Sequence, residues 1–184
     1  MITTFVVRVE DRPGVLTRVA EVFRRRAFNI ESLTVGRAES PGVSRMTIVV
    51  DTDDYGARRL EANLYKLVNV LRVDTITSQP SVFRDLALVK VATTAETRAQ
   101  VMQLVEVFRA RVVDVAPTSL VIEITGTEDK IDSLVEVLRQ YGVLEMARTG
   151  RLAMMRGSAP TTVQTTVADV DLEVPDESNV SYSV

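Results

Sequence analysis

The chain shows two hydrophobic periods, and the points where the period changes mark its predicted elements. Residues 2–10 alternate between apolar and polar positions, which is the period of a strand with one buried face. A turn with Pro13 placed to open a helix follows, and apolar residues then recur at helical spacing over 14–26. Extended segments are predicted at 29–37 and 44–51. Asp53 can cap a second helix, whose apolar residues run to Val68, and a closing strand is predicted at 70–77. The first 77 residues therefore predict the order β-α-β-β-α-β.

The second half repeats this order after a short linker. Strands are predicted at 82–93, 111–116, 119–125 and 142–148, the last of these being the final strand, and helices at 95–109 and after Gly126. Thr93 and Glu96 have the spacing of a capping box at the start of the first of these two helices. The predicted fold class is α+β, with two ferredoxin-like βαββαβ domains at residues 1–77 and 82–157.

Residues 158–184 differ in character from the two predicted domains. All 22 basic residues of the chain lie at or before Arg156, and five acidic residues follow it. This segment is polar and acidic with isolated valines, so it has too little apolar surface to offset the entropy lost on ordering, and we expect a disordered tail. The spacing of Val167, Val170 and Val174 leaves open a segment that orders on a partner.

The composition argues against several classes of function. The chain has no His and no Cys, so it cannot build the commonest proton shuttle, a thiol nucleophile, an iron–sulfur cluster or a typical zinc site. No motif gathers its carboxylates, and we predict no catalytic and no metal-binding residues. The part through Arg156 has a net charge of +2, from 22 basic and 20 acidic residues, and aromatic residues make up only 5% of the chain. Both observations argue against nucleic-acid binding.

Neither a membrane segment nor an export signal is predicted. The chain has no run of about 18 apolar residues. Its first residues also lack the basic and long apolar regions of a signal peptide. Since there is no cysteine either, we expect a cytoplasmic location.

Each predicted domain is small enough to need support from a partner. Domains of about 60–80 residues bury little apolar surface alone. An antiparallel sheet with helices on one face also leaves its other face and its edges in need of cover. Self-association would supply that cover, so we expect a homodimer through the N-terminal domain.

The segment Asp11–Leu16 could bind a carboxylate through its backbone. A tight turn between a strand and a helix brings free N–H groups and the positive end of the helix dipole together, which suits an anion without any side-chain cation. Gly14 would let a ligand approach the backbone closely, and Asp11 could accept hydrogen bonds from an ammonium group. The same pattern is that of an ordinary turn at the start of a helix, and the segment alone leaves both interpretations open.

Asn29 and Ile30 form a second candidate segment. The Asn29 amide offers a donor and an acceptor to the backbone groups of an amino acid, and Ile30 would line a small apolar pocket. Asn29 also stands just after the first predicted helix, where Asn often serves as a left-handed C-cap. A purely structural role is therefore open here too.

A wider set of motifs around these segments resembles an ACT domain, the small-molecule sensor of amino-acid metabolism. This resemblance rests on residues 11–16 (DRPGVL) and 28–33 (FNIESL). Further motifs are similar to one family in particular, the regulatory (small) subunit of acetolactate synthase, also called acetohydroxyacid synthase. They are 44–47 (SRMT), 66–71 (KLVNVL), 86–91 (LALVKV), 113–115 (VDV), 122–126 (IEITG), Glu145 and 147–150 (ARTG). The resemblance covers about residues 1–157.

The resemblance implies a function for the whole assembly. L-valine, the end product of the pathway, would bind between two ACT units paired side by side. The implied contacts are Asp11, Gly14, Val15 and Leu16 from one subunit, and Asn29 and Ile30 from its neighbour. The partner would be the large catalytic subunit, which would hold thiamine diphosphate, Mg²⁺ and FAD and would condense pyruvate with pyruvate or 2-oxobutyrate. This chain would hold no cofactor itself; it would activate that subunit and confer valine feedback inhibition on branched-chain amino acid synthesis.

Two alternatives remain open at this point. The chain could be a free-standing ACT-type sensor that binds another amino acid and regulates a different protein, such as a transcription factor. It could, less in keeping with its composition, be an enzyme on its own. Copurification with a large thiamine-dependent partner would exclude the first, and synthase activity of the isolated chain would support the second.

Overall fold

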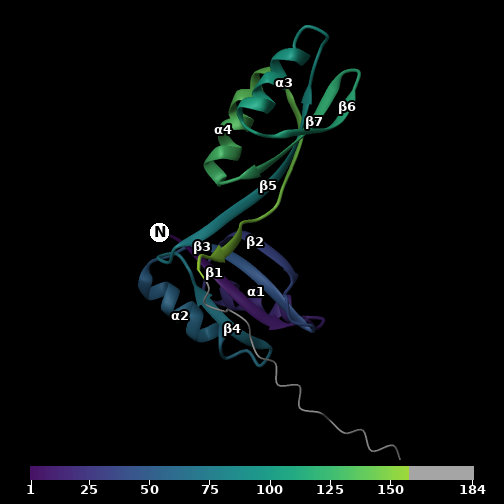
Figure 1. Ribbon diagram of the computed structural model, residues 1–184. Coiled ribbons are helices and arrows are strands. Elements are labelled where there is room, and N and C mark those ends of the chain that lie inside the picture. Colours follow the sequence, from purple (N-terminus) through teal and green to yellow (C-terminus); the bar gives the residue numbers. More distant parts are fainter. Residues whose placement is uncertain (158–184) are drawn as a thin grey trace, which may run out of the picture.

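The computed structural model describes residues 1–157, and the predicted tail at 158–184 lies outside them. Two α+β domains follow each other along the chain, and the long strand β5 runs from one to the other (Figure 1). The N-terminal domain consists of β1 (Ile2–Glu10), α1 (Val15–Arg25), β2 (Ile30–Arg37), β3 (Val43–Asp51), α2 (Asp54–Leu64) and β4 (Val70–Thr75). The order predicted for this half of the chain is therefore confirmed.

The four strands of the N-terminal domain form one antiparallel sheet in the order β2-β3-β1-β4. Both helices pack on the same face of this sheet. α1 packs there because Val15, Val19 and Phe23 recur about one turn apart and are all buried. α2 is capped as predicted, since the Asp53 carboxylate accepts a hydrogen bond of 2.7 Å from the N–H of Gly56.

The C-terminal domain repeats this architecture. Its elements are β5 (Ser81–Ala92), α3 (Arg98–Val107), β6 (Arg111–Ala116), β7 (Ser119–Gly126), α4 (Glu128–Leu138), the single 3₁₀ turn η1 (Arg139–Tyr141) and β8 (Val143–Arg148). The sheet order is β6-β7-β5-β8, with α3 and α4 packed on one face over a second hydrophobic core. The predicted α+β class with two ferredoxin-like βαββαβ domains is confirmed.

The capping box predicted at Thr93 and Glu96 is wrong. α3 begins at Arg98, and its N-cap residue Thr97 makes no side-chain capping bond. A tight turn before the helix accounts for the later start, because the N–H of Thr94 donates to Thr97 Oγ1 at 2.8 Å and the Thr94 hydroxyl donates to Glu96 Oε2 at 2.7 Å. Hydroxyl groups that bond locally in this way compete with helix formation.

The strand predicted at 142–148 is confirmed as β8, but the prediction that it is the final strand is wrong, because a ninth strand follows it. β9 (Leu152–Met155) pairs antiparallel with the start of β5, Ser81 lying opposite Met155. This two-stranded ribbon packs on the face of the N-terminal sheet that the helices leave open (Figure 1). Val6, Ile76 and Ala153 are buried there at 1–3% exposure. Part of the face for which we expected cover by self-association is thus covered by the chain itself.

Candidate functional site

The turn that opens α1 presents unpaired backbone donors. Gly14 is the N-cap residue, at φ 82°, a left-handed conformation that favours glycine. No side chain caps this helix. Within residues 1–157 the N–H groups of Gly14, Leu16 and Thr17 have no hydrogen-bond partner. Three donors and the positive end of the helix dipole therefore face the same exposed spot, which is the arrangement that binds a carboxylate.

Asp11 is fixed beside these donors. Its N–H donates to the carbonyl oxygen of Gly42 at 2.8 Å, and its Oδ1 accepts a hydrogen bond from Ser44 Oγ at 3.0 Å. The side chain is exposed, so the carboxylate faces solvent with its position set by β3. A carboxylate held next to free N–H groups is chemically suited to the ammonium end of an amino acid whose carboxylate binds those groups.

The other two predicted residues of this segment differ in exposure. Val15 is 4% exposed and belongs to the core of the domain, so only its backbone could face a ligand. Its N–H donates to the carbonyl oxygen of Arg12 at 3.3 Å. Leu16 is 43% exposed and offers an apolar surface beside the turn.

Asn29 lies between the end of α1 and the start of β2, and Ile30 is the first residue of β2. The residue in the left-handed conformation after α1 is Ala27, at φ 56°, so the alternative of a left-handed C-cap at Asn29 is wrong. The exposed Asn29 side chain donates from Nδ2 to Glu31 Oε1 at 2.8 Å. Ile30 is half-buried and packs against the core of the domain.

The two candidate segments do not meet within one chain. They lie at opposite ends of α1, whose 11 residues span about 16 Å at a rise of about 1.5 Å per residue. β2, which begins at Ile30, is an edge strand that pairs only with β3 in residues 1–157. A site that contains both segments therefore needs a second copy of the domain.

Asn69 also borders the turn, although the sequence pattern does not indicate it as a site residue. Its carbonyl oxygen accepts from the N–H of Glu10 at 2.9 Å, and its Nδ2 donates to Glu10 Oε2 at 2.6 Å. Its Oδ1 in turn accepts from Arg18 Nη1 at 2.9 Å. These bonds tie the end of β1 to α1. Spacing along the chain could not reveal them, because Asn69 is brought to the turn only by the pairing of β4 with β1.

Other kinds of site are not found in the part of the chain that the structure describes. In residues 1–157 no three acidic side chains lie close enough together to hold a metal ion. In the same range, no helix is long and apolar enough to cross a membrane.

Family models match nearly all of the two domains. Residues 5–72 match a model described as the ACT domain of AHAS small-subunit-like proteins. Residues 84–157 match a model described as the small subunit of acetolactate synthase. The two matches divide the chain at the same place as the two cores, since the gap between them contains the start of the ribbon strand β5.

Individual relatives agree with these matches. A protein of Archaeoglobus fulgidus named probable acetolactate synthase small subunit is 50% identical over 155 residues, which cover 84% of this chain and 97% of that protein. The acetolactate synthase small subunit of Mycolicibacterium smegmatis is 47% identical over 84% of this chain and 91% of its own length. The crystal structure of the Thermotoga maritima small subunit superposes with a TM-score of 0.81 at 40% identity, covering 86% of this chain and 99% of that one. The chain therefore belongs to the acetolactate synthase small-subunit family, and its N-terminal half is an ACT domain.

Proposed function

We propose that two copies of this chain pair through their ACT domains and bind L-valine between them, so that the chain activates the catalytic subunit and makes it sensitive to valine. In each site, the segment Asp11–Leu16 of one copy meets Asn29 and Ile30 of the other. The observation that carries the proposal is that these segments lie at opposite ends of α1 and that the second begins the edge strand β2. The chain is also 50% identical to a protein named probable acetolactate synthase small subunit.

The chemistry of the turn supports an amino acid as the effector. The free N–H groups of Gly14 and Leu16 complement its carboxylate, and the exposed Asp11 carboxylate complements its ammonium group. A small aliphatic side chain then lies near Leu16 and Ile30. A ligand held by two chains favours the paired state over separate domains, and in this way it shifts the population of conformations.

Catalysis belongs to the partner in this proposal. The large subunit would supply thiamine diphosphate, Mg²⁺ and FAD, and this chain would contribute regulation alone. The pathway is branched-chain amino acid biosynthesis, whose end product valine then limits its own formation.

Calorimetry with L-valine tests the effector site. Wild type should release or absorb heat that saturates at millimolar valine. Gly14→Asp should lose binding, because it places a side chain and a negative charge where the valine carboxylate would lie. Folding should persist, because no heavy atom lies within 4 Å of the added Cβ. The strain of a left-handed residue should cost about 1–2 kcal/mol.

Gly142→Asp is the matched control for that strain. Gly142 also has a positive φ, of 93°, but it lies in the C-terminal domain, where the nearest atom to an added Cβ is Ala92 Cβ at 3.7 Å. This variant should bind valine as wild type does. Absence of valine binding by the wild-type chain would refute the effector site.

Reconstitution with the large subunit tests the regulatory role. Addition of this chain should raise the turnover of the catalytic subunit, and valine should then lower it. Valine binding together with unchanged turnover of the large subunit would contradict the proposal and support a free-standing sensor instead.

A further inference from the structure

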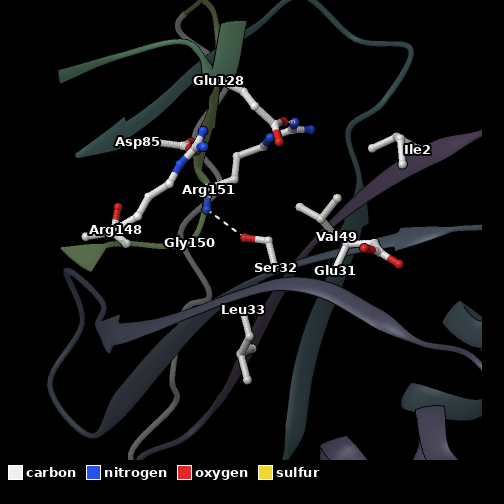
Figure 2. A pocket seen from close by; sticks show the side chains of 11 residues that line it. Ile2, Glu31, Ser32, Leu33, Val49, Asp85, Glu128, Arg148, Gly150 and Arg151 are labelled. Atoms are coloured by element: carbon white, nitrogen blue, oxygen red, sulfur yellow. Dashed lines mark hydrogen bonds and ion pairs between the residues drawn. The ribbon is translucent and has the colours of Figure 1, made fainter. Parts of the chain in front are cut away.

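Arg151 is the side chain that bridges the two domains. It lies in the segment that leads from β8 to β9, with a side chain that is 19% exposed. Its Nη1 donates to Thr4 Oγ1 of the ACT sheet at 3.3 Å, and its Nη2 pairs with Glu128 Oε2 at the start of α4 at 2.8 Å. The guanidinium also lies 5.4 Å from the centre of the Phe83 ring. One residue thus contacts the ACT sheet at Thr4, the ribbon at Phe83 and the C-terminal domain at Glu128. Figure 2 shows its guanidinium beside Glu128.

The backbone at Gly150 and Arg151 packs directly against β2. The N–H of Arg151 donates to Ser32 Oγ at 2.8 Å. At Gly150 an added Cβ would lie 2.6 Å from Thr34 Oγ1 and 2.8 Å from the carbonyl oxygen of Leu33, so only glycine allows this approach. Figure 2 shows the segment lying across β2 at Ser32. We call the contacts of Gly150 and Arg151 with Ser32 and Glu128 the interdomain clasp.

β2 connects the clasp to the proposed effector site. Ile30 and Ser32 belong to the same strand, and the pairing with β3 shifts register between them. Such a bulge leaves the strand locally less constrained. Glu31, at the bulge, receives the hydrogen bond from Asn29. A ligand that contacts Asn29 and Ile30 therefore acts two residues away from the clasp. It does so on an edge strand whose only paired strand in residues 1–157 is β3.

A second ion pair one turn further along α4 provides a comparison. Asp132 pairs with Arg148 Nη1 at 2.7 Å, and Arg148 Nη2 also pairs with Asp85 at 2.8 Å. Partial burial opposes the charged form of Arg148, but hydrogen bonds to Asp85 and Asp132 raise its pKa. All three residues belong to the C-terminal domain. Asp132 is 58% exposed and Glu128 54%, so the two pairs differ mainly in that only the arginine of the Glu128 pair also contacts the ACT domain, at Thr4 and Ser32.

A cavity of about 520 Å³ lies beside the clasp, between the domains. Its walls come from the ACT sheet, through Ile2 and Val49, and from the segment Arg148–Arg151. Because this space separates part of the two domains, the contacts of the clasp contribute directly to their relative orientation. Bridging ion pairs of this kind are suited to hold one of two such orientations.

We propose that Arg151 is a positioning residue that transmits effector binding from β2 of the ACT domain to α4 of the C-terminal domain. This inference rests on the proposed valine regulation for its functional part, but its structural part stands alone. Breaking the Arg151–Glu128 pair should loosen the orientation of the two domains and uncouple valine binding from its effect on the enzyme. Binding itself should remain, since neither residue touches the effector segments.

The structural part is tested by distances between spin labels. The chain has no cysteine, so Tyr55→Cys on α2 and Val107→Cys on α3 place two labels at positions that are 64% and 75% exposed. Labelled chains are mixed with excess unlabelled chain, so that only distances within one chain are measured. Glu128→Gln should broaden or shift the distance distribution, and the control Asp132→Asn should leave it as in wild type. An unchanged distribution in Glu128→Gln would overturn the proposal whether or not valine regulates the enzyme.

The functional part is tested with the reconstituted enzyme. For Glu128→Gln we expect the valine Kd from calorimetry to change by less than about twofold, while the coupling between valine and activity falls from a typical allosteric factor of roughly 5–150-fold to near one. Asp132→Asn should keep both the Kd and the inhibition. Full valine inhibition in Glu128→Gln, or an equal loss in Asp132→Asn, would overturn the coupling role. Absence of inhibition in wild type would instead refute the proposed function.

Discussion

Replacement of Gly150 by alanine tests how closely the segment after β8 must approach β2. The added Cβ would lie 2.6 Å from Thr34 Oγ1, 2.7 Å from Ser32 Oγ and 2.8 Å from the carbonyl oxygen of Leu33. The two hydroxyl groups can rotate away, but the carbonyl oxygen belongs to the backbone of β2 and cannot. The segment must therefore lift from the strand, and the bond from the N–H of Arg151 to Ser32 Oγ is lost with it.

The expected cost follows from three contributions. Overpacking against a fixed neighbour costs about 1–3 kcal/mol. Loss of one hydrogen bond adds about 1 kcal/mol. Alanine restricts the unfolded chain relative to glycine, which returns about 0.4–1 kcal/mol. The net destabilisation is then about 1–3.6 kcal/mol. For a chain of this length, each kcal/mol lowers Tm by about 2–4 °C.

Thermal unfolding followed by circular dichroism measures this shift, with Gly36→Ala as the matched control. Gly36 lies in the same strand, β2, and no heavy atom comes within 4 Å of a Cβ added there. The control should keep or slightly raise the wild-type Tm. If Gly150→Ala were as stable as Gly36→Ala, the close seating of the segment on β2 would be refuted.

Two further predictions concern other parts of the ACT domain. Asp53→Ala removes the cap of α2 and should lower the free energy of unfolding, measured by chemical denaturation, by about 1 kcal/mol. The control is Thr127→Ala, which changes the N-cap residue of α4, where no side-chain capping bond is made. A hydrogen bond that the Glu39 carboxylate accepts from its own backbone N–H, together with the nearby Arg8 guanidinium, holds the pKa of Glu39 below its ordinary value. The stabilisation by ionised Glu39 is therefore complete above the unfolded-state pKa and is lost as the pH falls through the folded-state pKa. Glu39→Gln should thus make Tm fall less steeply between neutral and acidic pH. An unchanged dependence of Tm on pH would count against the interaction.

Hydrophobic periodicity was enough to predict most of the fold, because each domain buries one face of regular elements over its own core. Asp53 is an example of a local signal that the structure confirms, since the cap involves residues three apart. β9 could not be found in this way. Its four residues become a strand only by pairing with residues 81–84, and they are stabilised by burial of Ala153 against Val6 and Ile76. Such an element depends on contacts between distant segments, which a local pattern does not contain.

The candidate site likewise contains residues that the local sequence predicts and residues that it does not. The turn at Gly14 was predictable, because a glycine between a strand and a helix has a local conformational reason. The contribution of Asn69 was not, because it reaches Glu10 through sheet pairing. Asn29 was assigned two alternatives, and the structure removes one of them by placing the left-handed residue at Ala27. The roles of Asp11–Leu16, Asn29 and Ile30 in binding an effector remain predictions.

The ribbon changes where a second copy of the chain can pair with the ACT domain. The sequence predicts that the open face of the sheet needs a partner, but Phe83, Ala153 and Met155 of the same chain occupy part of it. The half-buried Arg45 side chain also donates to the carbonyl oxygen of Ala153, which ties the ribbon to β3. The helices cover the opposite face. With both faces at least partly covered, the edges of the sheet are the natural surfaces for pairing. One of these edges is β2, which begins at Ile30. The same strand would then meet the second copy at its edge, the effector at its start and the interdomain clasp at Ser32, so pairing, binding and transmission would all act on one strand.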